Sequence, residues 1–168
     1  AKAVKNIKIC ESPKIIKDRL RAVGIKPINN IVDITNYILI ELGQPMHAFD
    51  YEKIGGHRIV VRRAEEGETI TTLDNTTHNL DNDVLVIADA EKPLAVAGIM
   101  GGLDSGISDD THTIIFESAK FARDNVRRTS RKLNLKSYSS ARFEKGIDFL
   151  SQAIAIDRAL TLIQTNGW

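Results

Sequence analysis

The amino-acid sequence predicts an α+β fold in which helices at both ends of the chain flank a mixed or antiparallel β-sheet core. Segments with helical caps and helical periodicity occupy the first and last parts of the chain, and short β-rich runs separated by turn residues occupy the middle. This order differs from the strand–helix alternation of a parallel α/β sheet. The 168 residues, 42% of them hydrophobic, suffice for one domain or two small fused ones.

The N-terminal segment predicts a strand followed by a helix. A strand is expected over residues 4–9. Ser12 and Pro13 then indicate a helix start, with Ser12 as the N-cap and Pro13 at the first helical position, where its missing N–H costs nothing. That helix is expected to end near Gly24.

A second helix is expected to begin at Asn29 or Asn30 and to run to Leu42, where Gly43 supplies the stop. The middle of the chain then changes to strands separated by clusters of Asp, Asn and Gly. The expected strands cover residues 59–62, 69–73, 84–88, 94–97 and 113–117. Most of the carboxylates in this middle part are therefore expected to be structural turn residues.

Helices are expected again near the C-terminus. One covers residues 123–133, and Asp148 is expected to cap the last one. Helical spacing places the following side chains on one apolar stripe of that last helix: Phe149, Ala153, Ile156, Leu160 and Ile163.

Charge is distributed unevenly along the chain, although the net charge is only +1. Residues 64–117 carry one Lys or Arg against twelve Asp and Glu, whereas residues 118–145 carry nine against two. A basic block inside a nearly neutral domain is a plausible contact surface for an RNA backbone. A solvated helix face is the alternative explanation.

Several common functional classes lack support in this sequence. The four His residues include no Cys/His pair at metal-ligand spacing, and no phosphate-binding, dinucleotide-binding or serine-nucleophile motif is present. The apolar run near residues 37–40 is far too short to cross a bilayer, so no membrane partner is expected. The single Cys10 has no internal disulfide partner, which fits a reducing compartment and predicts a cytoplasmic location.

Two parts of the first half carry candidate binding residues. In the second predicted helix, Thr35 and Asn36 fall inside an arc of apolar side chains. Buried polar groups need hydrogen-bond partners, which are either protein groups or a ligand. After the helix, a loop containing Pro45 is expected to present His47 from a rigid turn.

Two later segments are also informative. The apolar run of residues 94–102 breaks into glycines, which either let the backbone approach a ligand closely or form a plain bulge or turn. Glu117 ends an otherwise apolar strand, where an unpaired buried carboxylate costs several kcal/mol on transfer scales. Glu117 is therefore either exposed at the strand end or a hydrogen-bond acceptor in a pocket.

Five segments are distinctive when they are taken together. They are VDITNY (residues 32–37), ELGQPMHAFD (41–50), GIMGG (98–102), FESA (116–119) and SARFEKG (140–146). In this order and with this spacing, they resemble the B3/B4 region of the bacterial-type phenylalanyl-tRNA synthetase beta subunit. The resemblance covers nearly the whole chain.

The resemblance implies that residues 1–168 form a single editing domain, a fragment of a longer beta subunit. It implies an enzymatic role as part of phenylalanine-tRNA ligase, namely hydrolysis of mischarged Tyr-tRNA(Phe) by water attack on the aminoacyl ester. The alternatives are a non-catalytic RNA-binding or assembly module of the same synthetase, and a free-standing trans-editing hydrolase.

The same resemblance implies the partners. The domain is expected to bind the 3′ end of tRNA(Phe) and its tyrosyl ester. A catalytic alpha subunit is expected in the full alpha2beta2 assembly, and that assembly is expected to hold ATP and Mg²⁺ outside this domain. No cofactor or metal is expected in the domain itself.

By position in the resemblance, the editing residues fall on Asn36, His47, Gly101 and Glu117. A substrate-binding hydroxyl falls on Ser137, where relatives often carry Thr.

Two positions depart from the family pattern. Lys26 stands where the family has an Arg, which keeps the charge but loses the bidentate fork. Ser139 stands where a small Ala lines the pocket, which makes that wall more polar.

The chemistry implied for these residues rests on one hydroxyl group, which distinguishes Tyr from Phe. Glu117 is expected to accept the phenolic O–H, so that bound Phe would leave the carboxylate unpaired. Gly101 is expected to leave room for the ring, while Asn36 and His47 hold the ribose or ester and position water. Whether His47 acts as the general base or only positions water stays open. The helix expected over residues 123–132 is expected to contact tRNA phosphates.

Overall fold

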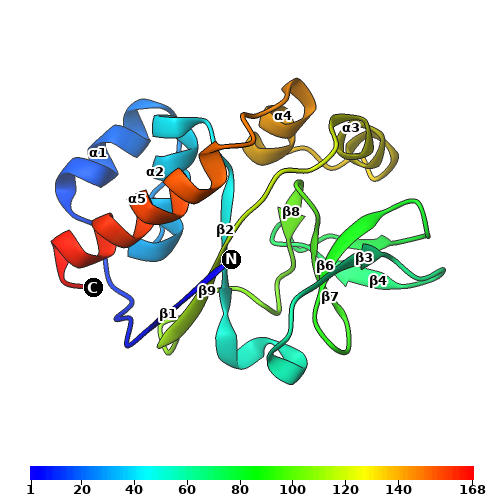
Figure 1. Ribbon diagram of the computed structural model, residues 1–168, viewed down its shortest axis with the longest axis horizontal. Coiled ribbons are helices and arrows are strands. Elements are labelled where there is room, and N and C mark those ends of the chain that lie inside the picture. The colour runs from blue at the N-terminus through cyan, green and yellow to red at the C-terminus, as the bar shows by residue number, and fades with distance from the viewer. The chain divides into compact units, whose positions relative to one another are not determined.

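The computed structural model describes residues 1–168 and confirms the predicted α+β class, with helices towards both ends of the chain and antiparallel sheets in between (Figure 1). The chain divides into two compact units that are both discontinuous in sequence. Unit 1 consists of Ala1–Asp50, Ile107–Ala119 and Ile147–Trp168. Unit 2 consists of Tyr51–Gly106 and Lys120–Gly146.

Unit 1 contains three helices and a three-stranded antiparallel sheet (Figure 1). In chain order its elements are β1 (Lys2–Lys5), α1 (Lys14–Ala22), α2 (Asn30–Leu42), β2 (Met46–Asp50), β9 (Thr113–Ser118) and α5 (Ser151–Asn166). The strand order is β1-β9-β2, so the late strand β9 lies in the centre and pairs with both early strands.

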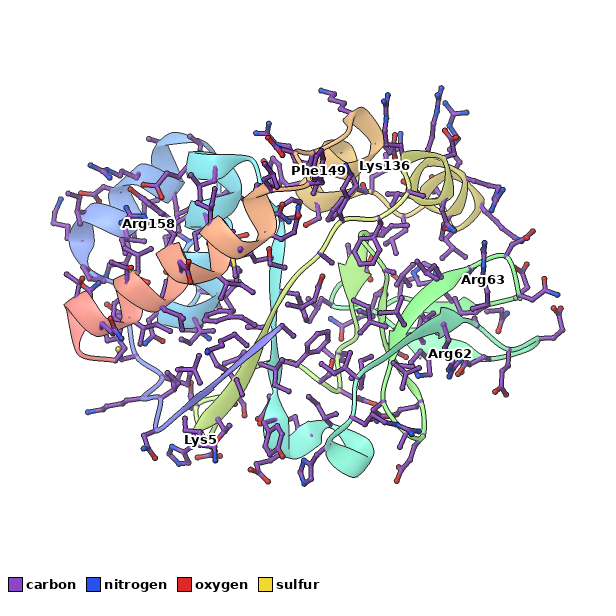
Figure 2. The ribbon with its side chains drawn as sticks, viewed as in Figure 1. Lys5, Arg62, Arg63, Lys136, Phe149 and Arg158 are labelled. Atoms are coloured by element: carbon purple, nitrogen blue, oxygen red, sulfur yellow. The ribbon has the colours of Figure 1, made fainter.

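The core of unit 1 lies between one face of this sheet and the helices α2 and α5. Ile114 and Phe116 of β9 are fully buried on that face. The other buried members of the cluster are Ile7, Ile31, Ile34, Ile38, Met46, Ala48, Ala155, Ala159 and Ile163. Burying this much apolar surface is the main force that holds the helices to the sheet. At the surface, the Arg158 guanidinium on α5 (labelled in Figure 2) donates two hydrogen bonds of 2.8 Å to the Glu41 carboxylate of α2.

The predicted boundaries of α2 are confirmed by its caps. The Asn29 side chain accepts a hydrogen bond of 2.9 Å from the Val32 N–H, which satisfies one free donor of the first turn. At the other end Gly43 takes the left-handed conformation with φ 72°, and its N–H donates to the Leu39 carbonyl. A residue with a Cβ would be strained in this conformation.

The N-terminal strand was placed too late by the sequence pattern. It covers Lys2–Lys5 rather than residues 4–9. Asn6 has φ 59°, a left-handed conformation that interrupts an extended strand. Ile7 nevertheless stays beside the sheet, because its N–H donates to the His112 carbonyl at 2.9 Å.

The helix start at Ser12 was also predicted incorrectly in detail. Helix α1 begins at Lys14, Pro13 occupies the N-cap position, and no side chain caps the helix. The Ser12 hydroxyl instead donates a 2.7 Å hydrogen bond to the buried Asp33 carboxylate. Asp33 also accepts from the Ile28 N–H at 2.8 Å, so a tertiary partner outcompetes the local cap.

The last helix begins later than predicted, and the face that it buries only partly matches the predicted stripe. The Asp148 carboxylate accepts a 2.8 Å hydrogen bond from the Leu150 N–H, which forms a bend, and α5 starts only at Ser151. Phe149 (labelled in Figure 2) is 68% exposed and does not belong to the buried stripe. The buried residues are Ala155, Ala159 and Ile163, because small side chains let α5 approach its neighbours closely.

Unit 2 combines two small antiparallel sheets with a pair of helices (Figure 1). Its strands are β3 (Val60–Arg63), β4 (Thr69–Thr71), β5 (Thr77–Asn79), β6 (Leu85–Ala88), β7 (Pro93–Val96) and β8 (Met100–Gly101). Its helices are α3 (Arg123–Lys132) and α4 (Tyr138–Lys145), with short 3-10 turns at Tyr51–Lys53 and Gly55–His57. One sheet has the order β3-β6-β7-β8, and the other pairs β4 with β5.

The glycine-rich turn after β7 joins the sheet of unit 2 to its helices. Gly98 has φ 72°, and a Cβ there would lie 2.8 Å from the Phe121 ring and 3.2 Å from both Phe143 and Val126. Glycine therefore serves both the turn and the close packing of this segment against the aromatic pair Phe121–Phe143. The chain then continues as the two-residue strand β8, so the glycine run does not end the sheet.

Candidate functional site

His47 lies on a strand and not on the rigid loop that the sequence pattern predicted. Pro45 precedes strand β2, which covers Met46–Asp50 and pairs with β9. A proline before the first strand residue removes a donor that the ladder does not use. Because the strand is short and buried along most of its length, it lacks the polar–apolar alternation that would have revealed it.

The register of β2 and β9 brings two of the predicted catalytic residues together. His47 is the direct cross-strand partner of Glu117, and Phe49 is the partner of Ile115. Directly opposed residues in an antiparallel pair extend from the same face of the sheet, with Cβ atoms about 5 Å apart. This is the face opposite the one that packs on α2 and α5, since the alternate residues Ile114 and Phe116 lie in that core.

Glu117 is held in an environment that opposes its ionisation. Burial raises the pKa of its carboxyl group to about 7, and no hydrogen bond from the protein stabilises the carboxylate. The group therefore exchanges its proton near neutral pH. A half-buried acid without an internal donor is able to bind a ligand that supplies an O–H or N–H group.

His47 is neutral in the same pH range, because burial lowers its pKa to about 4. Its Nε2 atom is buried and has no hydrogen-bond partner in the protein. The imidazole packs edge-on against Phe49, with ring centroids 4.5 Å apart and an interplanar angle of 69°. A neutral imidazole with a free nitrogen is able to bind water or a ligand hydroxyl.

Gln44 fixes the ends of these two strands, a role that the sequence analysis did not identify. Its side chain is fully buried, and its Nε2 donates to the carbonyl oxygens of Pro45 at 2.8 Å and Ala119 at 3.0 Å. Its Oε1 accepts from the Ser151 hydroxyl at 2.6 Å and from the Gln152 amide at 2.9 Å. One amide thus joins the start of β2, the segment after β9 and the first turn of α5. Its partners lie far apart in sequence, so no local signal reveals this role.

The two polar residues of α2 have different surroundings. The Thr35 hydroxyl donates to the Val32 carbonyl at 2.8 Å, so its partner is a protein group. Asn36 is half-buried and lies on the side of α2 opposite Ile34, whose side chain packs in the core. Lys26 is exposed in the segment between α1 and α2. The catalytic role of Asn36 and the binding role of Lys26 stay predictions.

The remaining predicted site residues belong to unit 2. Gly101 is buried in β8 opposite Ala95, and its carbonyl accepts from the Leu73 N–H at 3.0 Å. The Ser137 hydroxyl donates to the Ile99 carbonyl at 2.6 Å and, as the N-cap of α4, accepts from the Ser140 N–H at 3.0 Å.

This arrangement brings the predicted residues of unit 2 close together. The bond from Ser137 to Ile99 ties the first turn of α4, which includes the half-buried Ser139, to the strand that contains Gly101. The Ser137 hydroxyl therefore has a structural role. Substrate binding by these three residues stays a prediction.

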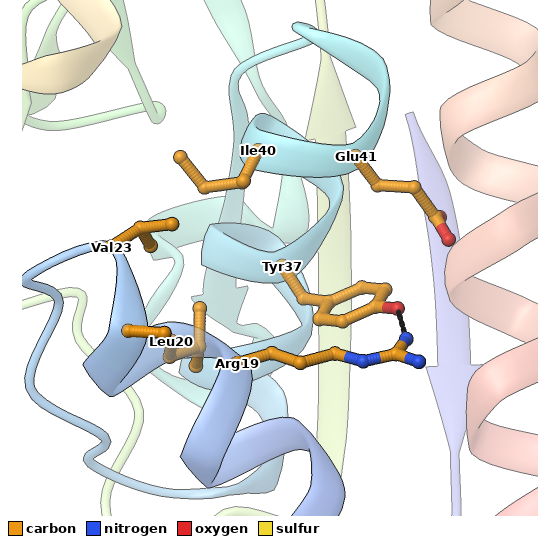
Figure 3. A pocket seen from close by; sticks show the side chains of 7 residues that line it. Arg19, Leu20, Val23, Tyr37, Ile40 and Glu41 are labelled. Atoms are coloured by element: carbon orange, nitrogen blue, oxygen red, sulfur yellow. Dashed lines mark hydrogen bonds between the residues drawn. The ribbon is translucent and has the colours of Figure 1, made fainter.

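A separate hollow of about 500 Å³ lies between α1 and α2 (Figure 3). Leu20, Val23 and Ile40 give it an apolar lining, and the Arg19 guanidinium donates a hydrogen bond to the Tyr37 hydroxyl at its edge. None of the residues predicted to take part in catalysis lines this hollow. The cross-strand pair is therefore the better candidate site.

Metal-ligand clusters and membrane-spanning helices are both absent from the fold. No group of three or more His, Cys, Asp or Glu side chains in the chain is arranged to hold a metal ion. None of the helices combines the length and apolar character that are needed to cross a membrane.

The fold and the site together define an α+β domain in which a half-buried carboxyl group stands opposite a neutral imidazole on paired strands. The chain matches the family model described as the B3/4 domain over residues 1–167, and it belongs to this family. The resemblance inferred from the sequence motifs is thereby confirmed.

Curated relatives share this region at high identity. The chain is 52% identical over 164 residues to the phenylalanine–tRNA ligase beta subunit of Clostridium acetobutylicum, covering 98% of this chain and 21% of that protein. It is 56% identical over 163 residues to the protein of the same name from Bacillus cereus, covering 97% and 20%. The Moorella thermoacetica protein of that name is 52% identical over 163 residues, with the same two coverages. The chain therefore spans about a fifth of the length of these relatives.

Proposed function

We propose that this chain is a tRNA-editing domain that hydrolyses tyrosine wrongly attached to tRNA(Phe), as part of a phenylalanine–tRNA ligase. The observation that carries the proposal is the in-register pair of Glu117 and His47 on β9 and β2. Membership of the B3/4 family and identity to beta subunits of this ligase support the same assignment.

Glu117 supplies the discrimination in this proposal. The two amino acids differ by one hydroxyl, and a hydrophobic pocket that merely tolerates a hydroxyl rejects it by only about 10²-fold. A site that contains a hydrogen-bond acceptor for the hydroxyl discriminates better, because a ligand without the hydroxyl leaves that buried acceptor unpaired. The Glu117 carboxyl group, half-buried and without an internal donor, is suited to accept the phenolic O–H of tyrosine.

His47 acts in this proposal by holding water or the ester, with little transfer of a proton to the ring. Burial keeps its pKa near 4, so the imidazole is a weak base at neutral pH. Its Nε2 is enclosed and has no internal partner, which leaves it available for a hydrogen bond to water. An aminoacyl ester is already activated, so orienting the attacking water makes a useful contribution to the rate.

The competing assignments are a non-catalytic RNA-binding module of the synthetase and a free-standing hydrolase. A non-catalytic module would have no need of a carboxyl group whose pKa is raised by burial, because such a group costs stability whenever it ionises. The free-standing hydrolase would use the same chemistry, and it differs from the proposal only in that the domain would not be part of a ligase. The relatives that span five times this length favour a domain of the ligase.

The proposal is tested by measuring the deacylation of Tyr-tRNA(Phe) and Phe-tRNA(Phe) with the wild-type chain and with Glu117→Ala. The wild-type chain is expected to hydrolyse the tyrosyl ester much faster than the phenylalanyl ester. The variant is expected to lose on the order of tenfold to hundredfold of this preference, which corresponds to one buried hydrogen bond to a charged group.

The matched control is Glu66→Ala, which removes an exposed carboxylate and should leave the preference unchanged. Equal selectivity in the wild type and in Glu117→Ala would refute the role of Glu117. Tight tRNA binding without any ester hydrolysis would instead identify the non-catalytic module.

A further inference from the structure

The helical part of unit 2 carries a concentrated positive charge that the candidate site does not use. Residues 120–146 contain nine Lys and Arg against two acidic residues. On α3, the side chains of Arg127, Arg128 and Arg131 are all exposed, whereas Val126 and Ser130 face the interior. The three arginines therefore share the outer face of the helix. Figure 2 shows Lys136, also exposed, in the segment between α3 and α4.

No ion pair or hydrogen bond in the chain engages the guanidinium groups of these three arginines, whereas several other cations of the same unit are paired. Lys132, on the same helix, pairs with Asp81. Arg62 of β3 binds Glu68 with N–O distances of 2.6 and 2.9 Å, and Lys92 pairs with Asp104 at 2.9 Å. Acidic partners are thus available in the unit, and the arginine cluster is left without them.

The spacing of the cluster adds to this contrast. Arg131 follows Arg127 by four residues and Arg128 by three, so like charges stand side by side on the helix surface, which disfavours the helix. The helix dipole compensates for a cation only in the last turn, and this accounts for Arg131 but not for Arg127 and Arg128. An anionic partner would account for all three.

We propose that Arg127, Arg128 and Arg131 form a binding surface for the sugar–phosphate backbone of the tRNA, a proposal that rests on the proposed editing function. Guanidinium groups present planar, bidentate donors that match phosphate oxygens. Contacts of this kind position an RNA without reading its sequence. The surface therefore binds charged and uncharged tRNA alike and contributes to substrate affinity, not to the choice between tyrosine and phenylalanine.

The test compares the binding of uncharged tRNA(Phe) to the wild-type chain and to the triple variant Arg127→Gln, Arg128→Gln, Arg131→Gln over a range of salt concentrations. Glutamine keeps the helix propensity, so helicity by circular dichroism should be unchanged. Each lost phosphate contact removes about 0.7 to 0.9 from the slope of log K against log salt. The slope of the triple variant is expected to be less steep by about 2 to 3. Its affinity near 0.1 M salt is expected to be lower by on the order of tenfold or more.

A control with the same change in net charge separates the surface from general electrostatics. Lys14→Gln, Lys17→Gln, Lys92→Gln removes three exposed or partly exposed cations that are ion-paired within the chain. This control is expected to retain nearly all of the wild-type slope. Equal losses in the control and in the arginine variant, an unchanged slope in the arginine variant, or no tRNA binding by the wild-type chain would each overturn the proposal.

Deacylation kinetics distinguish this proposal from the proposed function. The arginine variant is expected to raise the KM for Tyr-tRNA(Phe) while leaving kcat and the preference over Phe-tRNA(Phe) unchanged. If the wild-type chain binds tRNA through this surface but hydrolyses no ester, the editing function fails and the surface stands. If the variant hydrolyses Tyr-tRNA(Phe) with unchanged KM, the surface fails and the editing function stands.

Discussion

Glu117 combines a functional opportunity with a cost in stability. Its pKa in the folded chain is about 7, against 4.5 for an unperturbed carboxyl group, and burial is the cause. Between these two values the folded chain holds the proton more tightly than the unfolded chain. The contribution of Glu117 to stability therefore falls as pH rises through this window, and the full cost is present above pH 7.

Glu117→Gln is expected to remove this pH-dependent cost while keeping the shape of the side chain. The gain in free energy of unfolding over the wild type should be smallest below pH 4.5 and should grow by roughly 3 kcal/mol up to pH 8, following the shift in pKa. Urea denaturation at several pH values measures this difference.

The exposed Glu66 provides the comparison for this experiment. Glu66→Gln should show a nearly constant difference from the wild type across the same pH range. A flat difference for Glu117→Gln as well would mean that Glu117 is hydrated in the folded chain, and the basis for its role as acceptor would be lost.

At the residue scale, the family motifs pointed to candidate side chains, while the local sequence pattern did not predict their surroundings. The family motifs identified His47 and Glu117, and the structure places them in register. The sequence left open whether Glu117 is exposed or buried, because the last residue of a strand is compatible with either. Burial depends on what covers that face of the sheet, which is a non-local property.

At the element scale, the sequence predicted the end of a helix correctly where residues close by in the chain satisfy its free backbone groups. Asn29 and Gly43 bound α2 because a side-chain acceptor and a left-handed glycine satisfy its ends within a few residues. Ser12 was misread because its hydroxyl binds Asp33 in the first turn of α2, 21 residues further along the chain. Strand β2 was missed because its partner β9 lies more than sixty residues away.

Gln44 shows how these elements are held at the site. Gln44→Glu replaces the amide donor by an oxygen, so the carbonyl groups of Pro45 and Ala119 lose their partner and face a buried negative charge. The variant is expected to lose roughly 3 kcal/mol of unfolding free energy, because buried unsatisfied acceptors each cost about 1–3 kcal/mol. Urea denaturation at neutral pH measures the loss.

Gln164→Glu is the matched control, because Gln164 is exposed on α5. It should change the stability by less than about 0.5 kcal/mol, as is usual for surface substitutions. A loss in Gln44→Glu no larger than in this control would show that the amide network does not hold the strand ends.

At the scale of the whole molecule, the architecture depends on which distant segments of the chain pair, more than on which element each segment forms. The predicted succession of helices, strands and helices is confirmed, yet it does not reveal that the chain forms two units. Unit 1 takes its central strand from the short segment Ile107–Ala119, which lies in sequence between the two segments of unit 2. Such an arrangement follows from long-range pairing, for which single-sequence patterns give no signal.

This topology makes a prediction about truncation. Strands β1 and β2 pair with β9 and not with each other, so a chain that ends at Gly106 lacks the only partner of both strands and also lacks α5. The core of unit 1 then loses Ile114, Phe116 and the three buried residues of α5. Two unpaired edge strands without this core are not expected to be stable in water.

Amide hydrogen exchange tests this expectation. In the full chain, the backbone amides of β1 and β2 that pair with β9 should be protected, and in residues 1–106 they should exchange at rates typical of an unfolded chain. Adding residues 107–168 as a separate peptide should restore part of the protection, because it returns β9 and α5. Strong protection of the β2 amides in the truncated chain would contradict the central role of β9. It would also mean that the strand carrying the proposed water-positioning residue is ordered without the strand that carries Glu117.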